Sequence, residues 1–193
     1  MSNEDRRDHD DGWGNKAIQE AFADLRARVG EINQAYNPDD ENLHFVPSLK
    51  ANVRLYSELL ALARDGLARV ITYEWYFSSH ALYADGMFWY DLFLLISSAG
   101  VEAQRQRLAE QVPQDVVRGL VEVTVDIMRF SMVHLGDIVK RNHEALGNTL
   151  YGFYSPALMD LARTRAAASG SEPVIEAVEA TLSRVEEVRQ GKN

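Results

Sequence analysis

Apolar residues recur at alternating steps of four and three over most of the chain, and this spacing constrains the fold more than any other feature. The steps follow one face of an α-helix, which turns once in about 3.6 residues, and they are the spacing of a coiled-coil seam. The pattern predicts an all-α fold, a bundle of five to six helices in one domain over residues 15–193. The first seam comprises Ile18, Phe22, Leu25, Val29, Ile32 and Tyr36, and the second comprises Leu49, Val53, Tyr56, Leu60, Ala63, Leu67 and Val70.

The longest helix is predicted over about residues 47–84 and would form the centre of the bundle. Pro47 suits a first helical turn, and the seam keeps its phase through Gly66 at a cost of about 1 kcal/mol relative to alanine. The turn signal Asp85-Gly86 would make this helix one half of an antiparallel hairpin. Further helices are predicted over about 87–112, 113–146, 155–168 and 172–190, with a packed loop over 149–154.

Composition narrows the classes of function. The absence of cysteine excludes disulfides, thiolate metal sites and cysteine catalysis, and the formal net charge of −9 argues against non-specific nucleic-acid binding. Residues 1–14 are acidic and polar, with no apolar core of a signal peptide, and are predicted to be a disordered tail. No apolar run is long enough to span a bilayer, so a cytoplasmic protein without a transmembrane segment is expected.

The stretch Val70–Val101 holds two of the three tryptophans and the longest apolar run. Its aromatic side chains point in every direction around their helices, and one helix pair cannot cover all of them. They are therefore predicted to form a surface for a ligand or partner, with core packing of the hairpin as the alternative. The set comprises Tyr73, Tyr76, Phe77, Tyr83, Phe88, Trp89 and Phe93.

Ionisable residues interrupt the apolar stripes at a few positions. Glu74, Asp91 and His134 are candidate catalytic groups, because a buried carboxylate near an imidazole suits acid–base chemistry. Glu74, His80 and His134 are candidate metal ligands. The chain has no Glu-x-x-His pair, however, and a satisfied structural network that sets helix register is the favoured interpretation.

The dipeptide His143-Glu144 has a structural explanation. It is predicted to lie near a helix end, where a favourable contact with the helix dipole accounts for His143 without a function. No glycine-rich nucleotide motif, nucleophile elbow or His-Glu-x-x-His motif occurs, and the sequence identifies no cofactor.

These observations favour an interaction or assembly protein, either a homo-oligomer or one that binds a protein partner. Two narrow seams, Ile18–Tyr36 and Ile175–Val185, and the aromatic stretch support this hypothesis. One alternative is a bundle that uses Glu74, Asp91 and His134 to bind a small apolar ligand or a metal. The same residues could instead serve an acid–base enzyme, although catalysis is less favoured. Another is an amphipathic coat on an apolar particle or membrane surface.

Overall fold

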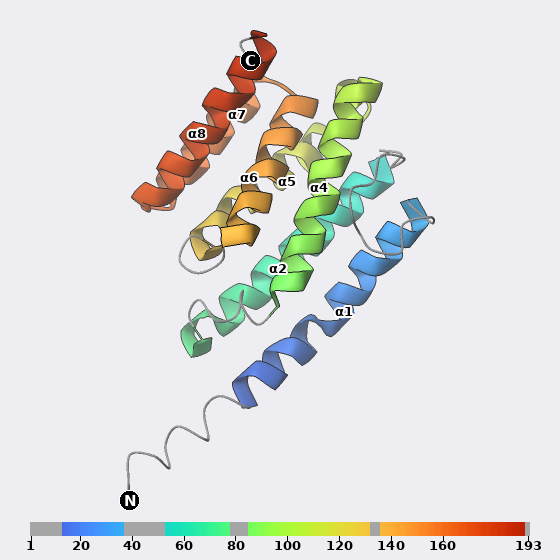
Figure 1. The fold of residues 1–193 in the computed structure, drawn as a ribbon, viewed down its shortest axis with the longest axis vertical. Coiled ribbons are helices and arrows are strands. Elements are labelled where there is room, and N and C mark those ends of the chain that lie inside the picture. Colours follow the sequence, from blue (N-terminus) through green and yellow to red (C-terminus); the bar gives the residue numbers. More distant parts are fainter. Residues whose placement is uncertain (1–12, 37–52, 78–84, 132–135, 192–193) are drawn as a thin grey trace, which may run out of the picture.

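The computed structural model describes residues 13–36, 53–77, 85–131 and 136–191, and its regular elements are all helices (Figure 1). The all-α prediction is therefore confirmed, with seven α-helices in the described residues where five to six were expected. The helices are α1 (Trp13–Tyr36), α2 (Val53–Phe77), α4 (Gly86–Gln106), α5 (Gln114–Ser131), α6 (Gly136–Gly152), α7 (Pro156–Ala168) and α8 (Glu172–Arg189), with a short 3₁₀-helix, η1 (Leu108–Glu110).

The helices pack in two layers. The front layer of Figure 1 runs α1, α4, α6 and α8 across the molecule, and the back layer runs α2, α5 and α7. Contacts of α2 with α1 and α4, of α5 with α6, and of α7 with α8 join the layers. The most extensive described contact is between α4 and α6, and α6 lies between α4 and α8. No helix in the described ranges contains a stretch long and apolar enough to cross a bilayer.

The central part of the predicted long helix is α2, which continues through Gly66 as expected. A Cβ atom at Gly66 would lie 2.6 Å from Phe88 Cε1 and 2.9 Å from Trp89 Cη2. The glycine therefore makes room for two aromatic rings of α4, which explains a helix-weakening residue at this position. The predicted ends of the long helix, 47–52 and 78–84, and residues 1–12 of the predicted tail lie outside the described residues.

The helix predicted over 87–112 is shorter in the structure. Arg107 adopts left-handed backbone angles, with φ 55° and ψ 47°, and its N–H bonds to the carbonyl oxygens of Ala103 and Gln104. This closing turn ends α4 at Gln106, and η1 follows. The sequence contains no glycine at this point, so the break had no local signal.

The single helix predicted over 113–146 is also wrong. The structure has two helices there, α5 in the back layer and α6 in the front layer, and α6 continues to Gly152 through most of the predicted loop. A Cβ atom at Gly100 of α4 would lie 2.6 Å from the carbonyl oxygen of Asn148. A Cβ atom at Gly152 would likewise overlap the carbonyl oxygen of Gly100, so Gly152 serves close helix packing rather than a loop. The last two helices begin and end within a residue of their predicted bounds.

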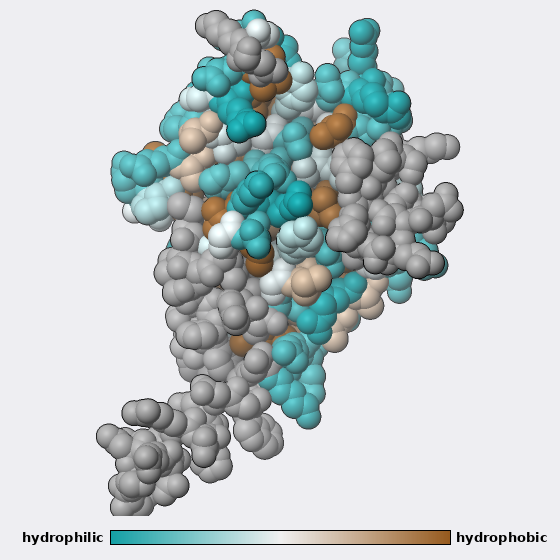
Figure 2. Space-filling model, viewed as in Figure 1, coloured by the Kyte–Doolittle hydropathy of each residue, from teal (hydrophilic) through white to brown (hydrophobic). Residues whose placement is uncertain are grey.

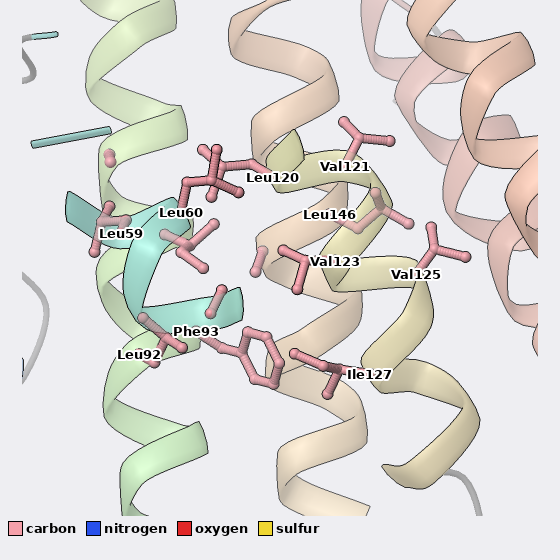
Figure 3. Packing of buried hydrophobic residues seen from close by; sticks show 14 of the residues in the cluster. Leu59, Leu60, Leu92, Phe93, Leu120, Val121, Val123, Val125, Ile127 and Leu146 are labelled. Atoms are coloured by element: carbon pink, nitrogen blue, oxygen red, sulfur yellow. The ribbon is translucent and has the colours of Figure 1, made fainter. Parts of the chain in front are cut away.

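The core fills the space between the layers. Leucine and valine side chains of α2, α4, α5 and α6 meet there (Figure 3). Toward α1 the core becomes aromatic: the Phe88 and Trp89 rings lie 4.9 Å apart between centroids, and Phe22 lies 5.6 Å from Phe88. Each fully buried side chain of this kind contributes about 1.5–3 kcal/mol.

Candidate functional site

The predicted cluster of ionisable groups is described only in part. Asp91 is half-buried on α4, whereas the side chains of Glu74, His80 and His134 lie outside the described residues. Whether these four groups converge therefore stays a prediction. In the described ranges, no three His, Asp or Glu side chains are placed to hold a metal ion together.

The predicted aromatic surface is corrected at three positions. Phe88, Trp89 and Phe93 are 0% exposed, because α1, α2 and α6 cover α4 on several sides and Gly66 admits the rings. They belong to the core, which is the alternative considered from the sequence. Tyr73 is half-buried and packs against the core. Tyr76, Phe77 and Tyr83 lie outside the described side chains.

The two narrow seams are buried within one chain. Phe22 and Leu25 of the first seam are 0% exposed on α1, which packs against α2 and α4. Val178 and Leu182 of the second are 0% exposed on α8, which packs against α6 and α7. Neither seam needs a second subunit for burial. Assembly through another surface, and coating of an apolar surface, stay predictions.

A buried carboxylate that was not singled out as a site lies at the start of α4. The Asp85 side chain is 0% exposed and forms an ion pair with Arg26 of α1. Burial raises the pKa of the Asp85 carboxyl to about 6, although Arg26 acts to lower it. Its Oδ2 atom has no hydrogen-bond partner in the described structure. The sequence showed only a turn signal here, since the burial depends on α1.

A groove of about 940 Å³ lies between α6 and α8. On α6 it extends from Gly136 to Tyr151, which is about 22 Å at 1.5 Å per residue. Its walls combine apolar side chains, Val139, Val185 and Val188 among them, with polar ones. On the front face, polar side chains cover most of the middle and a few hydrophobic ones show between them (Figure 2).

Two positive charges of the groove have no ion-pair partner in the part of the chain that the structure describes. Lys140 of α6 and Arg184 of α8 are exposed, and neither contacts a described carboxylate. The carboxylate of Glu144, also in the lining, is already paired with Arg141 at 2.8 Å. The groove is therefore locally positive in a chain of net charge −9. This contrast favours an anionic occupant.

His143 also lines the groove, and burial lowers the pKa of its imidazole below the ordinary value of 6.5. The ring is therefore neutral at pH 7, and its buried Nε2 atom has no described hydrogen-bond partner. The predicted contact with a helix end is wrong, because α6 continues to Gly152 and places His143 in its middle.

Comparisons of the chain with protein-family models, with curated proteins and with solved structures find no match.

Proposed function

We propose that the protein binds an amphipathic organic anion in the groove between α6 and α8. The observation that carries the proposal is the pair of cations, Lys140 and Arg184, which have no ion-pair partner among the described residues and lie in a groove with both apolar and polar walls. The proposal keeps the ligand-binding alternative drawn from the sequence and moves it to different residues.

The dimensions of the groove suit such a ligand. Pockets for small molecules have volumes of about 300–1,000 Å³ and combine apolar walls with a few polar groups. The groove volume of about 940 Å³ lies within this range. Its length supports an extended molecule, such as one with an alkyl chain, more than a compact one.

The chemistry of the lining assigns roles to its side chains. Val139, Val185 and Val188 would contact the apolar body of the ligand, while Lys140 and Arg184 would bind its acidic group. Both cations are exposed, so their contribution is modest and decreases with salt. Apolar burial would supply most of the affinity.

Calorimetric titration of the full chain with dodecanoate, compared with dodecyl alcohol, tests the proposal. We expect dodecanoate to bind more tightly, and the double variant Lys140→Gln/Arg184→Gln to lose roughly tenfold in affinity, because two exposed charge contacts contribute up to about 1 kcal/mol each. Arg118→Gln, which removes an exposed charge on α5, is the matched control. Equal binding of the acid and the alcohol would contradict an anion site.

A second variant tests the location. Ala180 lines the groove and is exposed, so Ala180→Trp should fill the groove without disturbing the core and abolish dodecanoate binding. Ala157→Trp, at an exposed position on α7, should leave binding unchanged. If Ala180→Trp binds dodecanoate as the unmodified chain does, the ligand is not in this groove.

A further inference from the structure

We propose that a recess between α4 and α6 is a second binding site, specific for a short-chain carboxylate. The recess has a volume of about 230 Å³ and lies on the other side of α6 from the groove. Glu144 and Asn148 line both openings. The proposal rests on the hydrogen-bond donors of the recess and does not depend on an occupant of the groove.

Three hydroxyl groups in the recess have protons without a described acceptor. The Tyr90 hydroxyl accepts a bond from Arg141 Nη2 at 3.2 Å, and Ser97 Oγ accepts one from Asn148 Nδ2 at 2.6 Å. Each oxygen therefore keeps its own proton for another acceptor. The Ser98 hydroxyl makes no described hydrogen bond, although Ser98 is only 6% exposed. A ligand with acceptor oxygens would satisfy these donors.

Arg141 adds a positive charge that is held in position. Its guanidinium lies over the Tyr90 ring at 5.2 Å from the centroid and binds Glu144 through Nη1 at 2.8 Å. A guanidinium has five donor hydrogens, so these contacts leave others for a second carboxylate. Glu144 repels an anion, but Arg141 already neutralises much of this charge. A ligand carboxylate would share the guanidinium with Glu144.

The remaining lining is apolar and suits a short alkyl chain. Leu94 is 5% exposed and Val101 is 40% exposed, and both line the recess from α4. A volume of about 230 Å³ corresponds to about eight water molecules at roughly 30 Å³ each. Such a space accommodates a carboxylate with a short alkyl chain, such as butyrate.

Titration of the isotope-labelled full chain with butyrate, followed by NMR chemical shifts, tests this site. We expect butyrate to shift the signals of α4 and α6 residues around the recess, and butyramide, its neutral analogue, to bind far more weakly. Ser98→Ala and Tyr90→Phe should each weaken butyrate about tenfold, because each removes a donor to a charged group. Ser183→Ala, at an exposed position on α8, is the matched control.

The outcomes separate the two sites. Ala180→Trp, which fills the groove, should leave butyrate binding unchanged; loss of butyrate binding in this variant would place butyrate in the groove and overturn the proposal. Equal binding of butyrate and butyramide, or unchanged affinity in folded Ser98→Ala and Tyr90→Phe, would also overturn it. Displacement of butyrate by an equal concentration of inorganic phosphate would overturn the assignment to carboxylates.

Discussion

Asp85 and Arg26 form a pair in which one partner is fully buried and the other is partly hydrated. Because burial raises the pKa of Asp85, the folded chain binds a proton there more readily than the unfolded chain does. This group therefore stabilises the fold at low pH, and the contribution is lost as pH rises from 3.8 to about 6. At neutral pH the buried charge is a net cost, which Arg26 reduces.

Asp85→Asn should consequently raise the free energy of unfolding at pH 7.5 by about 1–3 kcal/mol, since a shift of one pKa unit corresponds to about 1.36 kcal/mol. Arg26→Gln should lower it, because the carboxylate then loses its counter-ion. Urea unfolding between pH 4 and pH 8 measures both effects. A loss of stability in Asp85→Asn equal to that in Arg26→Gln would contradict the predicted cost of the buried charge.

His143 has the opposite pH dependence. Burial lowers the pKa of the imidazole, so the unfolded chain binds the proton more readily, and stability should fall as pH decreases below 6.5. We expect His143→Leu to remove this part of the acid destabilisation, and to raise stability at pH 7 by about 1 kcal/mol since the unpaired Nε2 is removed. Urea unfolding between pH 5 and pH 7 measures this effect. If the ring were accessible to water, the free energy of unfolding would depend on pH in the same way in His143→Leu and in the unmodified chain.

At the level of helices, α4 and α6 approach each other backbone to backbone. The backbone of Gly100 meets the backbone of Asn148 and Thr149, and Gly152 meets Gly100 in turn. Backbone atoms cannot move aside as the end of a flexible side chain can. The contact therefore sets the distance between α4 and α6, and with it the shape of the recess.

Gly100→Ala should destabilise the fold by about 1–3 kcal/mol, because the new methyl group would overlap the backbone of α6. Gly30→Ala is the matched control: a Cβ there meets nothing within 4 Å, and the change should stabilise α1 by about 0.5–1 kcal/mol. Thermal unfolding of both variants measures the difference. Equal effects of the two substitutions on stability would show that α4 and α6 can move apart without a loss of free energy of unfolding.

The seams explain how much of the fold was predictable. Alternating steps of three and four indicate a helix and its buried face, and the structure confirms the helices α1, α2 and α8 and most of their buried faces. Val53, at the start of α2, is an exception, because it was predicted on the second seam and is 42% exposed. The same spacing stays regular from α5 into α6 and gives no sign that the two helices are separate. For this reason α5 and α6 were predicted as one helix. The backbone angles of Arg107 had no sequence signal at all.

The candidate site was harder to predict, because it depends on helices that are distant in sequence. Lys140 and Arg184 are ordinary surface cations until α6 and α8 are placed side by side. The aromatic residues had a clear signal, but their exposure depended on whether other helices cover α4. That coverage is a property of the two layers and is absent from the spacing of any one helix.

For the molecule as a whole, the two layers bury both seams within a single chain, so folding should not require association. Phe22→Ala, which truncates a ring that is 0% exposed, should destabilise the fold by about 3–5 kcal/mol. Its unfolding midpoint, and that of the unmodified chain, should be independent of protein concentration. A midpoint that rises with concentration would show that subunits stabilise one another.

The contact between Gly100 and Gly152 also limits how the sequence can change during evolution. Any descendant that keeps α4 and α6 at this distance must keep residues without bulk at both positions, whatever happens to the side chains around them. Surface positions such as Lys140 are free of that constraint and can diverge as the occupant of the groove changes. The glycine pair would therefore outlast overall sequence similarity, and it offers a marker by which remote relatives of this fold could be found.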